Sequence, residues 1–227
     1  MIILTGASGG IGSLLIKHLA KYDKVIGLYN KSSPKIENVE NVNYVSLDLN
    51  SANEINSFFK KYSKSLSNIT IVHCAAIKKD NIAVSFDMHD WDNLFNINLK
   101  GNFLLNQCLI KKMIEQSWGR IIHISSKGAE NGEPGTVAYS ASKTALFGMS
   151  KVLSKEYARF NITSNIISLG AFNTGMYSVL DKKTQKDILQ KIPSKKLGEI
   201  NNIANAINFL MLSDYVNGSV ITIDGGV

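Results

Sequence analysis

The chain has 227 residues, of which 44% are hydrophobic and 19% charged, a composition that suits one globular domain with a full core. Its formal net charge of +7 comes from lysines scattered in separate pairs rather than from a basic stripe with interleaved aromatic residues, so we expect no nucleic-acid partner. Two distant cysteines exclude a disulfide framework. We expect a cytoplasmic protein, because the sequence shows neither a signal-peptide pattern nor an apolar run of the ~20 residues that cross a membrane.

Short apolar runs alternate with helical patterns in the first part of the chain. Strands are predicted at residues 2–5, 24–30, 42–47 and 69–74. A helix is predicted at residues 13–21, where leucines recur at helical spacing. Another helix begins at Ser51, which has Glu54 three residues later in the pattern of a capping box. The polar segment at residues 30–41 offers no good helix.

The same alternation continues to the end of the chain. Long helices are predicted at residues 90–113, where Gly101 weakens the pattern, and at residues 138–160. The remaining elements are strands at residues 121–125, 162–168 and 219–223 and a helix at residues 200–212. Residues 128–135 are predicted to be a loop, and residues 170–197 an irregular polar segment.

Strands that alternate with helices form a parallel sheet with helices on both faces. We therefore predict an α/β fold, a single Rossmann-type doubly wound parallel sheet of about seven strands. No linker interrupts the alternation, so residues 1–227 are predicted to be one domain. Ligands of such sheets bind at the carboxyl ends of the strands. The residues that follow strands are Gly6 to Gly12, Asp48, Ala75, Ala76, Ser126 and Gly170.

A glycine loop joins the first strand to the first helix. We expect Gly6 to permit a tight turn, Gly10 to let the backbone approach a pyrophosphate, and Gly12 to let helix and strand pack closely. The free N–H groups at the start of the helix would then bind the diphosphate. The loop lacks the lysine of a P-loop, which disfavours ATP hydrolysis, and a plain glycine-rich turn is the alternative.

Tyr139 and Lys143 lie four residues apart on a predicted helix, so they project from one face. A phenol titrates near pH ~10, and a neighbouring ammonium would lower that pKa and make Tyr139 a usable acid or base. Ser126 ends a predicted strand, and its hydroxyl would hold the same substrate oxygen. Taken alone, such a pair is more often a chance feature of a helix whose lysine is solvated.

Three features together resemble the short-chain dehydrogenase/reductase family. They are Thr5-Gly6-x-x-x-Gly10-Ile11-Gly12, Tyr139-x-x-x-Lys143, and Ser126 thirteen residues before the tyrosine. The further matches in the family's order are Asp48, Asn98 in Asn96-Ile-Asn98-Leu-Lys-Gly101, Thr174 and the closing Asp224-Gly-Gly226. The resemblance covers nearly the whole chain. Within the family, the chain resembles the 3-oxoacyl-[acyl-carrier-protein] reductases.

The resemblance implies a catalytic role for four side chains. Tyr139 would be the general acid/base, and Ser126 would hydrogen-bond the substrate oxygen and stabilise its charge. Lys143 would lower the pKa of the phenol and bind the nicotinamide ribose. Asn98 would hold a water that links Lys143 to solvent.

The resemblance also implies a set of cofactor contacts and no metal site. Asp48 would accept a hydrogen bond from the adenine amino group, with a simple turn or N-cap role as the alternative, and Thr174 would contact the carboxamide. The full set of cofactor-binding residues is Gly6, Ser8, Gly9, Gly10, Ile11, Asn30, Lys31, Asp48, Leu49, Ala75, Ala76, Tyr139, Lys143, Gly170 and Thr174.

The residues after the second strand favour NADP(H) over NAD. The family's NAD enzymes usually have an acid there, whereas this chain has Asn30, Lys31 and Ser32. A lysine and hydroxyls suit a 2′-phosphate. NAD remains possible, since Lys31 is alternatively just a solvated lysine.

The chain departs from the family pattern at two turns. His73-Cys74-Ala75-Ala76 stands where the family has Asn-Asn-Ala-Gly, and we interpret His73 as structural. Leu169-Gly170 replaces Pro-Gly, which we expect to loosen the loop against the nicotinamide. The short segment after the second strand predicts a more open adenosine pocket.

These features predict an NADP-dependent oxidoreductase that interconverts a carbonyl and a secondary alcohol. Reduction of a 3-oxoacyl thioester on a carrier protein is one case, and a sugar, polyol or small ketone is the alternative substrate. A non-catalytic NADP-sensing protein is the alternative from another class. We expect residues 130–137 and the loop region 170–198 to set the substrate. We also expect a homotetramer or homodimer, formed through residues 90–113, residues 138–160 and the C-terminal strand.

Overall fold

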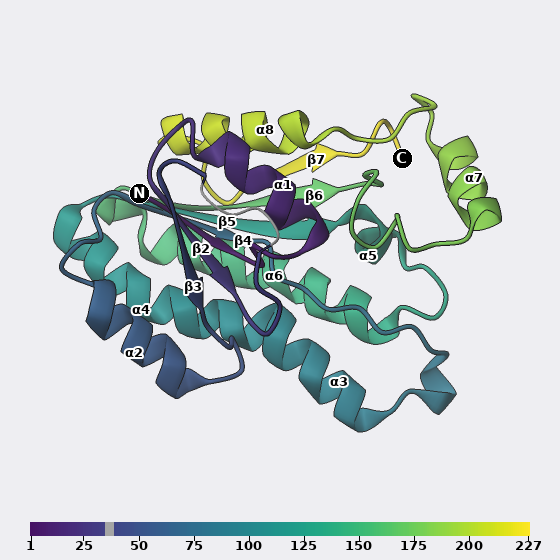
Figure 1. The fold of residues 1–227 in the computed structure, drawn as a ribbon, viewed down its shortest axis with the longest axis horizontal. Coiled ribbons are helices and arrows are strands. Elements are labelled where there is room, and N and C mark those ends of the chain that lie inside the picture. Colours follow the sequence, from purple (N-terminus) through teal and green to yellow (C-terminus); the bar gives the residue numbers. More distant parts are fainter. Residues whose placement is uncertain (35–38) are drawn as a thin grey trace.

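A computed structural model describes residues 1–34 and 39–227 of the protein (Figure 1). Its seven strands form one parallel sheet in the order β3-β2-β1-β4-β5-β6-β7, which confirms the predicted fold. The strands are β1 (Ile2–Thr5), β2 (Val25–Tyr29), β3 (Val42–Ser46), β4 (Ile69–His73), β5 (Gly119–Ser126), β6 (Ile162–Leu169) and β7 (Val220–Ile223). The prediction that residues 30–41 contain no helix falls partly on residues 35–38, outside the described residues.

Helices cover both faces of the sheet (Figure 1). The main ones are α1 (Gly10–Leu19), α2 (Ala52–Tyr62), α4 (Gly101–Gln116), α6 (Val137–Glu156) and α8 (Ile200–Leu212). One core lies between the sheet and α1 and α8, and a second lies between the sheet and α2, α4 and α6. Across residues 1–34 and 39–227, no helix is both long and apolar enough to pass through a membrane.

Two segments predicted to be irregular contain helices. Residues 128–135 were expected to be a loop, but a single turn, α5 (Lys127–Asn131), follows β5 directly. Within residues 170–197 lies α7 (Lys182–Lys191), which has no buried residue. The prediction for residues 170–197 was wrong because α7 lacks the apolar period that marks a packed helix. The sequence signal for α7 is its N-cap Asp181, whose side chain accepts hydrogen bonds from two backbone N–H groups.

The helix predicted at residues 90–113 is interrupted. It consists of α3 (Met88–Phe95), a π turn (Asn96–Lys100, η2) and α4. A π turn holds one more residue than an α-helical turn, and Asn98 within this turn is buried. The residue after the π turn is Gly101, and a Cβ at this position would lie 2.8 Å from Leu49. The glycine therefore reflects a close approach of two segments rather than a weak helix. Short 3₁₀ turns occur at η1 (Ala83–Ser85) and η3 (Ala158–Phe160).

Candidate active site

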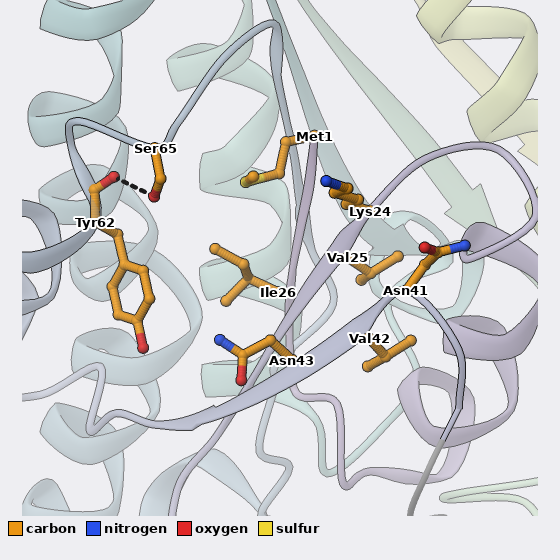
Figure 2. A pocket seen from close by; sticks show the side chains of 9 residues that line it. All are labelled: Met1, Lys24, Val25, Ile26, Asn41, Val42, Asn43, Tyr62 and Ser65. Atoms are coloured by element: carbon orange, nitrogen blue, oxygen red, sulfur yellow. Dashed lines mark hydrogen bonds between the residues drawn. The ribbon is translucent and has the colours of Figure 1, made fainter.

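The predicted site residues gather at the carboxyl ends of the strands. Strand order reverses at β1, which has β2 and β3 on one side and β4 to β7 on the other. Such a switch point is where open α/β sheets bind their ligands. A surface groove exists at the opposite, amino-terminal edge; Figure 2 shows it lined by Met1, Lys24, Asn41 and Tyr62 among others, and it takes no part in the predicted site.

Thr5 and Gly6 connect the glycine loop to the turn after β4. The hydroxyl oxygen of Thr5 accepts from the backbone N–H groups of Cys74 and Ala75, both at 3.0 Å. Gly6 has φ +72°, and a Cβ there would lie 2.8 Å from the Cα of Ala75. Only glycine therefore fits, on grounds of both conformation and space. The two predicted cofactor-binding segments are held as one unit.

The start of α1 fits an anionic group. Gly9 is the N-cap and provides no side-chain capping bond, and the first turn has no acidic residue. The N–H groups at this end are thus available, and the helix dipole favours negative charge there. Ser8 and Ile11 flank the same turn. This is the observation that makes the loop suitable for the diphosphate of a dinucleotide.

The structure adds a second reason for Gly10, whose approach to a pyrophosphate stays a prediction, and corrects the reason given for Gly12. The backbone that approaches Gly10 is that of Gly175, whose Cα would lie 2.2 Å from a Cβ at position 10. Thr174 donates from its hydroxyl to the Gly10 carbonyl at 2.9 Å. A Cβ at Gly12 would lie 2.2 Å from the Gly6 carbonyl oxygen, so Gly12 serves the closure of the loop rather than packing of the helix on the strand.

Asp48 closes a turn after β3. Its Oδ1 accepts from the backbone N–H of Asn50 at 2.9 Å, so the turn role is realised. Ser51, not Asp48, caps α2 by accepting from the Glu54 N–H. The predicted capping box is only half present, because the Glu54 carboxylate accepts from the Asp48 N–H instead. Leu49 is buried beside Asp48, and the contact of Asp48 with an adenine stays a prediction.

Asn30 and Lys31 are exposed directly after β2. They lie in sequence next to Tyr29, which pairs with Ser46 at the end of β3. The carboxyl ends of β2 and β3 are therefore adjacent, and Asp48 follows β3 within two residues. This places an exposed lysine on the same side of the sheet as the predicted adenine contact.

Tyr139 is buried in the first turn of α6, with an exposed fraction of 9%. Burial raises the pKa of its phenol, while a hydrogen bond with Ser126 acts in the opposite direction. Ser126 therefore lies close enough to the phenol to affect its pKa, and the shared binding of one substrate oxygen stays a prediction. Lys143 lies one turn further along α6, and the lowering of the phenol pKa by its ammonium stays a prediction.

Lys143 is 3% exposed, which excludes a solvated lysine. Its Nζ donates to the backbone carbonyl of Ile124 at 2.7 Å, and burial lowers its pKa to about 8. The lysine is thus directed toward β5.

Asn98 is completely buried and braces two segments. Its Oδ1 accepts from the Ile77 N–H at 2.9 Å, and its Nδ2 donates to the Ile77 carbonyl and to the Ser142 hydroxyl, both at 3.0 Å. Ser142 in turn donates to the Tyr139 carbonyl at 2.8 Å. Both N–H groups of the Asn98 amide therefore have protein partners, and the water-holding role stays a prediction.

The Leu169-Gly170 departure does not loosen the end of β6. Leu169 pairs with Ile223 of β7 and is 4% exposed, and the Gly170 N–H donates to the Ile223 carbonyl at 2.9 Å. A Cβ at Gly170 would lie 2.7 Å from the Cα of Asp224. Leucine allows the sheet ladder to continue where proline would remove a donor.

Sequence reasoning missed two polar clusters near the site. His73 is structural as interpreted, but it stacks on His123 and its Nε2 lies 2.7 Å from Asn106 Oδ1. The signal was present as Asn98, Asn102 and Asn106 at four-residue spacing on a helix. In the second cluster, Ser168 of β6 donates to the carboxylate of Glu130, which fixes α5 beside Ser126. Nothing local in the sequence indicates that contact.

Comparisons with known proteins agree with this geometry. The chain matches the family model of the short chain dehydrogenases over residues 1–185. It is 37% identical to a 3-oxoacyl-[acyl-carrier-protein] reductase of Rickettsia typhi, covering 99% of this chain and 95% of the relative. It is 32% identical to the enzyme of the same name from Aquifex aeolicus, covering 99% and 96%. A putative gluconate dehydrogenase from Agrobacterium tumefaciens, 24% identical, has the same fold with a TM-score of 0.91, covering 99% of this chain and 94% of that one.

Proposed function

We propose, from the premise that this chain belongs to the short-chain dehydrogenase family, that it is an NADP(H)-dependent carbonyl reductase with Tyr139 as its general acid/base. Membership makes it an oxidoreductase that acts on C=O and CH–OH groups with a nicotinamide cofactor. The observation that carries the proposal is the buried Tyr139 phenol, which lies beside Ser126 at the carboxyl edge of the sheet.

The state of Tyr139 suits reduction. Because burial raises its pKa, the phenol is protonated at neutral pH and is ready to give its proton to a carbonyl oxygen. Ser126 donates to that same oxygen and stabilises the charge that develops on it. Asn98 fixes the Tyr139 turn through Ser142 and so holds the phenol in place. The Tyr139 phenol that gives up the proton is therefore already held in its position beside Ser126.

The cofactor would supply the hydride. The N–H groups at the start of α1 would bind its diphosphate, Asp48 its adenine, and Thr174 its carboxamide. Lys143 would leave the Ile124 carbonyl to bind the ribose, and in that position its ammonium would come to act on the phenol. The dual role of Lys143 therefore depends on the loaded state of the enzyme.

We favour NADP(H) because Lys31 is exposed at the end of β2 and suits a 2′-phosphate. The test compares kcat/KM for NADPH and NADH in the wild type and in Lys31→Glu. We expect a preference for NADPH that Lys31→Glu reduces, whereas Lys21→Glu at the opposite end of β2 leaves it unchanged. A wild-type preference for NADH contradicts the cofactor assignment.

The substrate we propose is a 3-oxoacyl thioester on an acidic carrier protein, as in the names of the relatives. Support within this chain comes from α7, whose exposed lysines 182, 183, 186 and 191 lie in the region predicted to set the substrate. A screen that follows NADPH absorbance with 3-oxoacyl carrier thioesters, small ketones and sugars tests this. Turnover of only a sugar or a small ketone overturns the thioester assignment and keeps the reductase.

We further propose a cytoplasmic homotetramer. Apolar side chains line a groove between α4 and α6, namely Phe95, Leu99, Phe103, Ala145 and Met149. Leu212 and Tyr215 after α8 and Val220 at β7 are also exposed. These surfaces belong to the two predicted assembly regions. A monomeric mass in light scattering refutes the assembly.

A further inference from the structure

Four polar side chains are buried together inside the core beneath the site. His73 on β4 and His123 on β5 are register partners, and their rings stack with centroids 4.8 Å apart and an interplanar angle of 8°. Side chains alternate along a strand, so both rings lie on the face that packs against α4. Asn102 and Asn106 lie one turn apart on α4. All four are at most 1% exposed.

The direct bonds within this cluster leave many polar atoms unsatisfied. Asn106 Oδ1 pairs with His73 Nε2, and Asn102 Nδ2 donates to the Asn98 carbonyl at 2.9 Å. The buried atoms without a partner are His73 Nδ1, both ring nitrogens of His123, Asn102 Oδ1 and Asn106 Nδ2. Each such atom costs free energy in a low-dielectric core, so a concentration of them calls for a partner.

The donors and acceptors left over match what water offers. If His73 donates from Nε2, its Nδ1 is an acceptor, as is Asn102 Oδ1, while Asn106 Nδ2 is a donor. Neutral His123 adds one donor and one acceptor. Both imidazoles are neutral, because burial lowers the pKa of His73 to about 4 and that of His123 well below its ordinary value. Water, which both donates and accepts, satisfies such a mixed set where an ion of either sign does not.

Lys143 lies beside this cluster. Its Nζ donates to the carbonyl of Ile124, the residue that directly follows His123 on β5, and its charge lowers the pKa of both histidines. The titratable groups whose pKa shifts are coupled to it are His73 and Cys74 at the end of β4 and His123 on β5, and Tyr139 lies one turn before it on its own helix. The residues that α4 contributes to the cluster are uncharged amides. Among the described residues, Nζ makes one hydrogen bond, to Ile124. An ammonium has three donors, so two are left for other partners.

We propose that His73, His123, Asn102 and Asn106 enclose an internal water site, and that this water solvates the Lys143 ammonium from within the core. The site is distinct from the water predicted at Asn98, whose side-chain N–H groups already have protein partners. The water site itself does not depend on the proposed function. Only the importance of a charged Lys143 rests on that function.

The first test is a high-resolution crystal structure of the cofactor-free protein. We expect an ordered water within about 3.2 Å of at least two of the unpartnered atoms. A dry cluster whose side chains rotate to bond one another overturns the water site. This test needs no variant and no activity, so it stands whether or not the reductase assignment is correct.

The second test measures the titration of Lys143 by NMR in protein labelled at lysine Cε, with Lys143→Met to assign the signal. His123→Phe keeps an aromatic ring and removes both polar atoms. We expect it to lower the Lys143 midpoint by about one pH unit, because the water that solvates the charged form loses the two ring nitrogens that help to hold it. Thr70→Val, which removes an unpartnered hydroxyl from the opposite face of β4, leaves the midpoint unchanged. Equal midpoints in the wild type and His123→Phe overturn the link to Lys143.

Discussion

Replacing Thr5 by valine removes one hydroxyl and keeps the shape of the side chain. That hydroxyl oxygen accepts from the N–H groups of Cys74 and Ala75 in a part of the core where Thr5 is completely buried. Water has no access to replace it, so both donors are left unpaired. An unpaired buried donor costs about 1–3 kcal/mol, and because the two share one acceptor we expect a total loss of about 2–4 kcal/mol in the free energy of unfolding.

Urea denaturation of the wild type, Thr5→Val and Thr70→Val measures this loss. Thr70 is also completely buried on a strand, but its hydroxyl has no partner, so the same substitution there removes an unsatisfied group. We expect Thr70→Val to change stability by at most about 0.5 kcal/mol, or to stabilise. Equal losses in the two variants would show that the Thr5 bonds do not hold the turn, and would refute the reasoning.

Three other predictions concern the site. Tyr139→Phe should reduce turnover on the order of 10²–10⁴-fold while cofactor affinity in calorimetry is retained; unchanged turnover removes Tyr139 from the chemistry, and Tyr157→Phe at the end of α6 is the control. Lys143→Met should weaken cofactor binding roughly 10–100-fold as well as turnover, whereas Lys151→Met on the same helix should not; unaltered affinity contradicts the ribose contact. The unfolded chain protonates His73 between pH 6.5 and about 4 whereas the folded protein does not, so stability should fall as pH falls through that window. His73→Asn should flatten this decline, measured by denaturation at each pH, and an identical slope would exclude His73 as its source.

The sequence predicts local relations in this site better than distant ones. Tyr139 and Lys143 share a helix face because their spacing alone places them there. The sheet follows in the same way, since each strand is an apolar run between helical patterns. The contact of Ser126 with Tyr139 is different, because spacing along the chain says nothing of how β5 meets α6. The position of Ser126 at a strand end suggested that expectation, and the resemblance to a family strengthened it.

What could not be predicted depends on packing between elements. The direction of Lys143 is decided by a backbone carbonyl on β5, which no pattern within α6 reveals. The helix α7 was missed because none of its residues is buried, so no packed face imposes an apolar period on them. Gly101 was taken as a weakness of a helix, although it serves the close approach of Leu49 from another element. For Lys143 and Gly101 the determining atom belongs to another element.

The contact between Gly10 and Gly175 has a consequence for protein engineering. Thr174 and Gly175 belong to the region predicted to set the substrate, yet they lie directly on the loop predicted to bind the cofactor. A grafted specificity segment that places a larger residue at position 175, or that moves its backbone, would alter the space above Gly10. The segment and the glycine loop therefore form one exchangeable module, and a transplant between relatives should carry both.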